Sequence, residues 1–171
     1  MMMTATNTTN DQNQHQSQKT EFSIFDVRYS ARMEQYNAIF YQRADNLLTI
    51  LQLILGSSIA IQLGNPTVVG FVIVAISMIM FTVKPAQIAA KSDIQYHRYL
   101  PLLTSKLSDE NLHTAFLETQ KQDSKVLLSL SNLAYIRAGI ECGLDMSNEV
   151  LTTKEKLLAT FIGESLKKTN N

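Results

Sequence analysis

The most constraining feature of the sequence is a stretch of 38 residues, Asn46 to Val83, that contains no charged side chain. Charged residues make up 18% of the whole chain, so this gap is a strong local bias. A turn signal, Gly64-Asn65-Pro66, divides the stretch into segments of 18 and 17 residues, 46–63 and 67–83. A helix of about 20 apolar residues crosses a bilayer core roughly 30 Å thick, with a range of about 17 to 25 residues. The stretch therefore predicts a transmembrane hairpin of two short spans.

The charges that flank the hairpin predict its orientation. Three arginines precede the first span and three basic residues follow the second, while the turn carries none: Arg28, Arg32, Arg43, Lys84, Lys91 and Arg98. Because basic residues stay on the cytoplasmic side, both termini are expected in the cytoplasm and the turn outside. Aromatic and basic side chains beside the spans are expected to act as interfacial anchors, namely Tyr36, Phe40, Tyr41, Arg43 and Lys84.

The segments before the hairpin have two different patterns. Residues 1–20 are rich in Asn, Gln, Thr and Ser, which predicts a disordered tail. Residues 21–45 place apolar side chains at spacings of three and four, from Phe25 to Leu47, which predicts an amphipathic juxtamembrane helix. No Gly or Pro occurs between this helix and Gly56, so we expect it to continue into the first span without a break.

The region after the hairpin, 84–171, is predicted to be helical and cytoplasmic. Pro85 should end or kink the second span, and further helices are expected over 86–99, 109–122 and 124–141. A last helix begins with a capping box, Thr152 and Glu155, and Gly143 lies where a helix would end in a left-handed residue. No strand pattern competes, so the predicted fold class is all-α: a membrane protein with a two-helix transmembrane hairpin and cytoplasmic helices.

Composition argues against several functions. The chain has 15 basic and 15 acidic residues, so direct binding to nucleic acid through a broad basic surface is not expected. A single cysteine, Cys142, excludes a disulfide framework and a cysteine-rich zinc site. His15, His97 and His113 lack metal-ligand spacing, and no catalytic or phosphate-binding motif is present. We therefore expect a protein that is not an enzyme, with no cofactor and no metal.

Small and polar residues inside the spans suggest two interpretations. They line up at helical spacing as Thr49, Gln52, Gly56 and Ala60 on the first span, and as Gly70 and Ser77 on the second. They either pack the two helices of the hairpin together or line a water path. Because two helices enclose no lumen, a pore would require a homo-oligomer.

The layout resembles a family of bacterial proteins. Arginines and aromatics in Arg-Tyr-Ser-Ala-Arg-Met-Glu-Gln-Tyr (28–36) precede the first span, and Pro-Ala-Gln-Ile-Ala-Ala-Lys-Ser-Asp (85–93) follows the second. Over about Phe25 to Leu107 this is similar to the SLATT-type two-helix membrane effectors of bacterial defence loci, and to the transmembrane effectors that accompany retrons. The resemblance does not extend to residues 108–171.

The resemblance implies a multi-pass protein of the bacterial inner membrane that oligomerises in the lipid bilayer. When triggered, such a protein permeabilises the membrane, as in antiphage abortive infection. The trigger would be a regulatory protein or a nucleotide-signalling partner encoded nearby. Two alternatives stay open on the residues alone: a passive two-span anchor or immunity or exclusion protein whose cytoplasmic helices dock a partner, and a soluble bundle with an unusually apolar hairpin.

Overall fold

The fold is built from helices connected by short turns and by two longer loops, 121–127 and 142–152. A computed structural model describes residues 23–60, 64–105 and 108–164, and all regular structure in these ranges is helical. The elements are α1 (Ile24–Ala60), α2 (Pro66–Val83), α3 (Pro85–Thr104), α4 (Asp109–Gln120), the short 3₁₀ helix η1 (Leu128–Leu130), α5 (Ser131–Glu141) and α6 (Thr153–Ile162). The predicted disordered tail, 1–20, lies outside the described residues.

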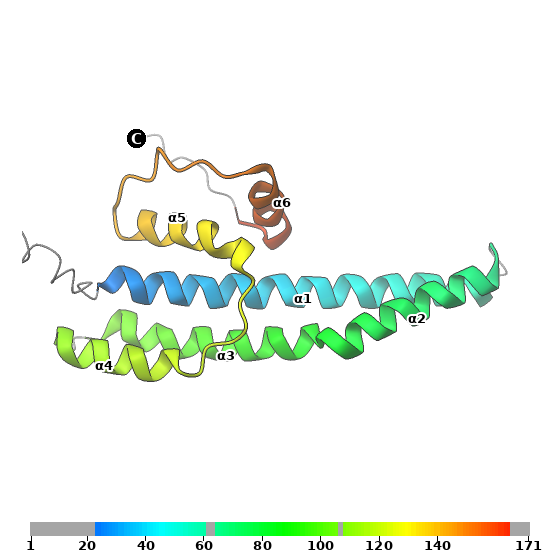
Figure 1. Cartoon of the computed structure of the whole chain (residues 1–171), viewed down its shortest axis with the longest axis horizontal. Coiled ribbons are helices and arrows are strands. Elements are labelled where there is room, and N and C mark those ends of the chain that lie inside the picture. Colours follow the sequence, from blue (N-terminus) through cyan, green and yellow to red (C-terminus); the bar gives the residue numbers. More distant parts are fainter. Residues whose placement is uncertain (1–22, 61–63, 106–107, 165–171) are drawn as a thin grey trace, which may run out of the picture.

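Helix α1 is the axis of the molecule, and α2, α3, η1, α5 and α6 all pack directly on it. It has 37 residues, which at 1.5 Å per residue makes it about 55 Å long. This confirms that the amphipathic helix continues into the apolar stretch without a break. Helices α2 and α3 return antiparallel to α1 along its length (Figure 1).

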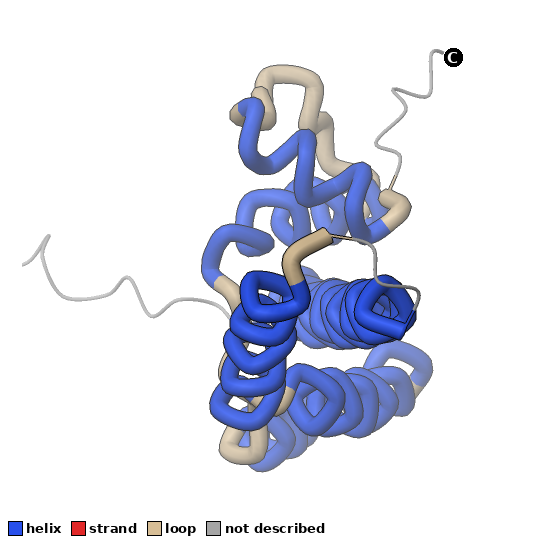
Figure 2. The backbone as a smooth tube through the Cα atoms, turned by 90° about the vertical axis from the view of Figure 1, so that its right-hand side faces the viewer, coloured by secondary structure: helices blue, strands red, loops and turns tan. Residues whose placement is uncertain are grey.

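The first half of α1 lies between two layers of helices, each with its own core. Helices α5 and α6 lie on one side of α1, and α3 and α4 lie on the other (Figures 1 and 2). Met33 and Tyr36 face the first layer and pack with Leu130, Leu133 and other apolar residues of η1, α5 and α6. The second core includes Val27 and Ala31 of α1, Tyr99 and Leu102 of α3, and Leu112 and Phe116 of α4. The apolar stripe predicted from the sequence therefore accounts for one of two buried faces.

Two predicted helix boundaries are wrong. Helix α3 does not stop near Tyr99 but continues through Pro101 to Thr104. Pro101 is exposed and close to the helix end, so the carbonyl group that loses its partner can be solvated. The helix predicted over 124–141 begins only at η1 and α5, because the backbone N–H groups of Ser124 and Leu127 bond to side chains of α1 instead.

The predicted helix ends agree better with the structure. Thr152 and Glu155 form the capping box at the start of α6, with the Thr152 N–H donating to Glu155 Oε2 at 2.7 Å. Gly143, with φ +76°, follows α5 in the left-handed conformation that favours glycine. Ser108 occupies the N-cap position of α4 but makes no capping hydrogen bond there.

Candidate membrane hairpin and the bundle that holds it

The ends of α2 are fixed by local sequence signals. Asn65 is the N-cap, and its Oδ1 accepts a hydrogen bond of 3.0 Å from the Thr67 N–H, while Pro66 occupies the first helical position. At the other end Lys84 adopts a left-handed conformation with φ 51°, and its N–H donates to the Met80 carbonyl at 3.0 Å. Pro85 then starts α3, so Lys84 is the joint between two helices. Pro85 thus ends α2, as predicted.

One helical stretch is long and apolar enough to cross a membrane by length and composition. Within the described residues this is Pro66–Thr104, whose most apolar window of 18 residues has a mean hydropathy of 2.3 and is only 6% buried. The core helix of a soluble protein would be mostly buried. The first predicted span does not meet the same criterion over its described part, which ends at Ala60; residues 61–63 lie outside the described ranges.

The second half of α1 and α2 form a hairpin that extends beyond the helix bundle (Figure 1). Ile76 is the one buried residue of α2. Phe71 and Phe81 are 73% and 78% exposed. The other large apolar side chains exposed here are Leu47, Ile50, Leu51, Leu53, Ile54 and Ile59 of α1, and Val68, Val72, Val74, Met78, Ile79 and Val83 of α2. Apolar surface this extensive marks a region that contacts lipid or other protein.

Two of the polar residues predicted inside the spans contact each other. Gln52 and Ser77 are brought together across the hairpin, where Gln52 Nε2 donates to Ser77 Oγ at 2.8 Å. Ser77 Oγ in turn donates to the Ile73 carbonyl at 2.8 Å. These contacts join the two polar side chains across a single hairpin, as the packing interpretation predicts.

The glycines of the spans do not serve packing within the hairpin. A Cβ atom added to Gly56 or to Gly70 would meet no heavy atom within 4 Å, so neither position is required for close approach of α1 and α2. Thr49 is exposed, and the side chain of Ala60 lies outside the described set. The open space at both glycines leaves their faces accessible to another molecule.

Tyr36 is not where an interfacial anchor would lie. It is 2% exposed and belongs to the core between α1 and α6. It lies on the apolar stripe of residues 21–45, at a position that faces α5 and α6. Phe40 is half-buried and packs edge-to-face on Phe161 of α6, with ring centroids 5.4 Å apart.

The other expected anchors lie near the junction of hairpin and bundle. Tyr41 is half-buried against Phe40. Arg43 is exposed, and its Nη1 donates to the Phe161 carbonyl at 2.6 Å, where a cation stabilises the end of α6. Lys84 is exposed with its ammonium group 5.9 Å from the centre of the Phe81 ring.

A buried polar cluster, which no pattern in the sequence predicts, joins α1 to the loop after α4. Glu34 and Asn37 are 1% and 0% exposed. Glu34 accepts hydrogen bonds from the N–H and the hydroxyl of Ser124. Asn37 accepts from the Leu127 N–H at 3.0 Å, and its amide donates to Ser92 Oγ at 2.7 Å and to the Lys125 carbonyl at 3.2 Å. The loop is thereby fixed to the middle of α1.

The same loop is bonded to α3 through Asp123. Its Oδ1 accepts hydrogen bonds from Gln95 Nε2 at 2.8 Å and from the Tyr99 hydroxyl at 2.6 Å. Gln95 is 1% exposed and also donates to the Thr119 carbonyl at 2.6 Å. Desolvation, together with the bond to Asp123, raises the pKa of Tyr99 above its ordinary value.

A cluster of charged residues joins α1 to α5. Arg28 and Arg32 of α1 both pair with Glu141, Arg28 at 3.7 Å. Arg137 pairs with Glu141 at 3.0 Å and with Glu164 at 3.4 Å. Desolvation, and then the nearby negative charge of Glu164, raises the pKa of Tyr36, which lies against this cluster. The first half of α1 is therefore connected to both layers through polar contacts as well as apolar packing.

No group of three or more His, Cys, Asp or Glu side chains suited to a metal ion occurs in the described part of the chain. Comparisons with protein-family models, with curated proteins and with solved structures gave no match. The assignment of this chain therefore rests on its own residues: an all-helical protein in which a helical bundle holds an exposed apolar hairpin.

Proposed function

We propose that this protein crosses a bacterial inner membrane twice, with both termini in the cytoplasm. The observation that carries the proposal is the exposure of the hairpin, whose most apolar window is only 6% buried. Helix α2 has 18 residues, or about 27 Å, which is close to the thickness of a bilayer core.

The second span of the proposal is the C-terminal half of α1. This half packs antiparallel to α2, and no charged residue occurs in either segment between Asp45 and Lys84. If α2 enters the bilayer, its neighbour must enter with it. Arg43 and Lys84 then lie at the same surface, and the turn at Gly64 and Asn65 lies on the opposite one, as the positive-inside rule requires.

We further propose that the protein is a membrane effector, which oligomerises and permeabilises the membrane when a cytoplasmic signal reaches the bundle. Three features support this. Helix α1 is continuous from the bundle into the hairpin, so displacement of its first half moves the second. Polar contacts at Glu34 and Asn37 connect it to the loop at 121–127, and the open faces at Gly56 and Gly70 can receive another copy. The SLATT-like layout gives this activity its context in antiphage defence.

A second candidate is a passive two-span anchor whose cytoplasmic helices dock a partner. The bond between Gln52 and Ser77 favours it, because these side chains find their partners within one hairpin and need no water path. Both candidates share the same topology and differ in whether the hairpin conducts.

Topology is tested by cysteine labelling of intact cells. Cys142 is the single cysteine of the chain, so a Cys142→Ser background is free of thiols. An Asn65→Cys variant in that background should react with a membrane-impermeant maleimide on intact cells. A Lys125→Cys variant, on the exposed loop of the bundle, should react only after the membrane is permeabilised. Equal labelling of the two variants in intact cells would refute the two-span topology.

Conduction is tested by inducing the protein and following membrane potential and propidium entry. An effector should depolarise the cells, and Gly56→Leu should suppress this by blocking contact between copies without disturbing the hairpin, since Gly56 faces open space. Val74→Leu, at a position 56% exposed, is the matched control and should leave the effect intact. Membrane insertion without depolarisation would reject the effector and favour the anchor.

A further inference from the structure

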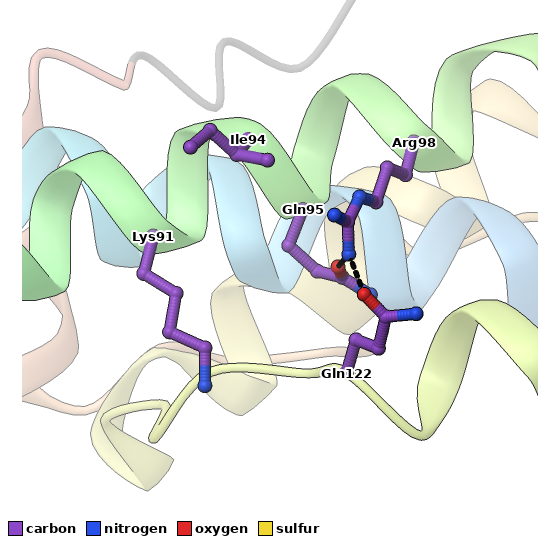
Figure 3. A pocket seen from close by; sticks show the side chains of 5 residues that line it. All are labelled: Lys91, Ile94, Gln95, Arg98 and Gln122. Atoms are coloured by element: carbon purple, nitrogen blue, oxygen red, sulfur yellow. Dashed lines mark hydrogen bonds between the residues drawn. The ribbon is translucent and has the colours of Figure 1, made fainter.

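A pocket in the bundle has the composition of a binding site and has no role in the proposed hairpin. It has a volume of about 380 Å³ and is lined by Lys91, Ile94, Gln95 and Arg98 of α3 and by Gln122 of the loop after α4 (Figure 3). Pockets that hold small molecules typically have volumes of about 300–1,000 Å³. In Figure 3 the side chains of Lys91, Gln95 and Arg98 extend from α3 toward this loop.

The two cations of the pocket have no carboxylate partner. Lys91 and Arg98 are exposed, and neither lies within 4.0 Å of an Asp or Glu side chain in the described ranges. Lys91 Nζ donates to the Asp123 carbonyl at 3.4 Å, and Arg98 donates to the amide oxygens of Gln95, at 3.4 Å, and Gln122. These neutral acceptors leave both positive charges available to an anion.

Hydrogen bonds to the bundle interior hold the buried side of the pocket in place. Gln95 is 1% exposed, and its amide donates to the Thr119 carbonyl and to Asp123. Asp123 also accepts from the Tyr99 hydroxyl, so its Oδ1 already has two donors from α3. The Asp123 carboxylate is therefore engaged with neutral donors of the bundle interior, while Lys91 and Arg98 are exposed.

We propose that this pocket binds a phosphorylated small molecule. The planar guanidinium of Arg98 suits phosphate oxygens, and Lys91 adds a second, movable cation. The two cations lie seven residues apart on one face of α3, so their backbone positions are about 10 Å apart along the helix. We therefore expect a ligand with more than one anionic group, whose less polar part lies beside Ile94 between the cations. The Gln122 amide becomes free to bind the ligand when Arg98 turns to the phosphate.

The phosphate groups have two sources, a soluble compound or a lipid headgroup. Lys91 is seven residues beyond Lys84, where the proposed span ends, or about 10 Å along α3. The headgroup layer on one side of a bilayer is only about 5–8 Å thick. Lys91 therefore lies beyond the headgroup layer, which favours a soluble ligand. The choice between the two sources rests on the proposed topology, whereas the proposal of a binding site does not.

The test uses the full chain in phosphatidylcholine nanodiscs, titrated calorimetrically with sodium tripolyphosphate. We expect saturable binding that Lys91→Gln and Arg98→Gln each weaken by about tenfold or more, because each removes a charge-assisted contact. Lys154→Gln makes the same change of charge at an exposed position of α6 and should leave the affinity unchanged. Thermal melts should confirm that all variants are folded, as expected for exposed residues.

Two results would overturn the proposal: no saturable binding, or equal weakening by Lys154→Gln, which would indicate unspecific attraction. Nanodiscs containing phosphatidylglycerol distinguish the sources. If headgroups reach the pocket, they compete with tripolyphosphate and its affinity falls in these nanodiscs; unchanged affinity identifies a soluble ligand. If the protein binds tripolyphosphate but does not depolarise cells, the proposed binding site is supported and the proposed effector function is refuted.

Discussion

The buried amide of Asn37 gives the sharpest test of how the bundle is connected to the hairpin. Asn37→Ala removes an acceptor from the Leu127 N–H and donors from Ser92 and the Lys125 carbonyl. Ser92 keeps a partner, because its hydroxyl also bonds to Ser124 at 2.6 Å. Two backbone groups, one N–H and one carbonyl, are therefore left unpaired in a site that is closed to water on the α1 side.

A buried polar group that loses its partner costs about 1–3 kcal/mol. Two such groups give a loss of roughly 2–4 kcal/mol in the free energy of unfolding, taking the lower range for the partly exposed carbonyl of Lys125. For a chain of this size about 2–4 °C of melting temperature corresponds to each kcal/mol, so we expect the melting temperature to fall by about 4–16 °C. Asn46→Ala, at an exposed position of the same helix, should change stability by less than about 0.5 kcal/mol.

Thermal circular dichroism in detergent measures the global effect, and amide hydrogen exchange measures the local one. Exchange of the Leu127 N–H should accelerate in Asn37→Ala and not in Asn46→Ala, since the native partner of that N–H is Asn37 Oδ1. If both variants shift the melting temperature equally, or if exchange at Leu127 is unchanged, the amide does not fix the loop to α1 and the signalling route proposed for α1 loses its physical basis.

Three further predictions concern the hairpin, the tyrosines and the last helix. Gln52→Leu and Ser77→Ala should each lower the free energy of unfolding in detergent by about 0.6–2 kcal/mol, because each breaks the bond across the hairpin. In a double-mutant cycle, the variant with both substitutions should lose no more stability than the more damaging single variant. Burial raises the pKa of Tyr36 and Tyr99, so the folded state favours their neutral forms; the stability this gives is present below about pH 10 and is lost at higher pH. Tyr36→Phe should therefore reduce the loss of stability between pH 9 and 11 in alkaline melts, with an unchanged pH profile as the contrary result. Bonds from Thr152 lower the pKa of Glu155, giving stability that is present above the ordinary pKa of a glutamate, about 4.3, and is lost as the pH falls below it. Glu155→Gln should therefore lower the melting temperature at pH 7 more than at pH 3, and an equal shift at both would contradict this.

The parts of the fold that local sequence determines were predictable. The absence of Gly and Pro before Gly56 predicted the continuity of α1, and Thr152 with Glu155 predicted the start of α6. Asn65 and Pro66 marked the turn and the start of α2. Each of these features is set by the local sequence of its own segment, so no knowledge of tertiary contacts was needed.

The parts that depend on contacts between distant residues were not predictable. Glu34 and Asn37 lie off the main apolar stripe and would face solvent in an isolated amphipathic helix. They are buried because the loop after α4, 90 residues away in the chain, covers that side of α1 and supplies their partners. The same contacts keep Ser124 to Leu127 from continuing as a helix. A polar residue that is inconsistent with the apolar pattern is a weak signal of such a cluster, and nothing in its spacing identifies the partner.

The first half of α1 buries polar side chains, whereas its second half exposes apolar ones. Water alone as the solvent does not explain both halves. Before Asp45 the helix buries a carboxylate and an amide; after it, six large apolar side chains of α1 and eight of α2 are exposed. Burying one such side chain fully is worth about 1.5–3 kcal/mol, so these fourteen, each exposed by roughly half, represent on the order of 10 kcal/mol or more in water. That equals the whole stability of a typical domain, about 5–15 kcal/mol. The bundle is complete without this surface, since both of its cores are formed by other residues. The hairpin therefore requires an apolar surrounding that the rest of the described chain does not provide, and this supports the proposed placement of the hairpin in lipid.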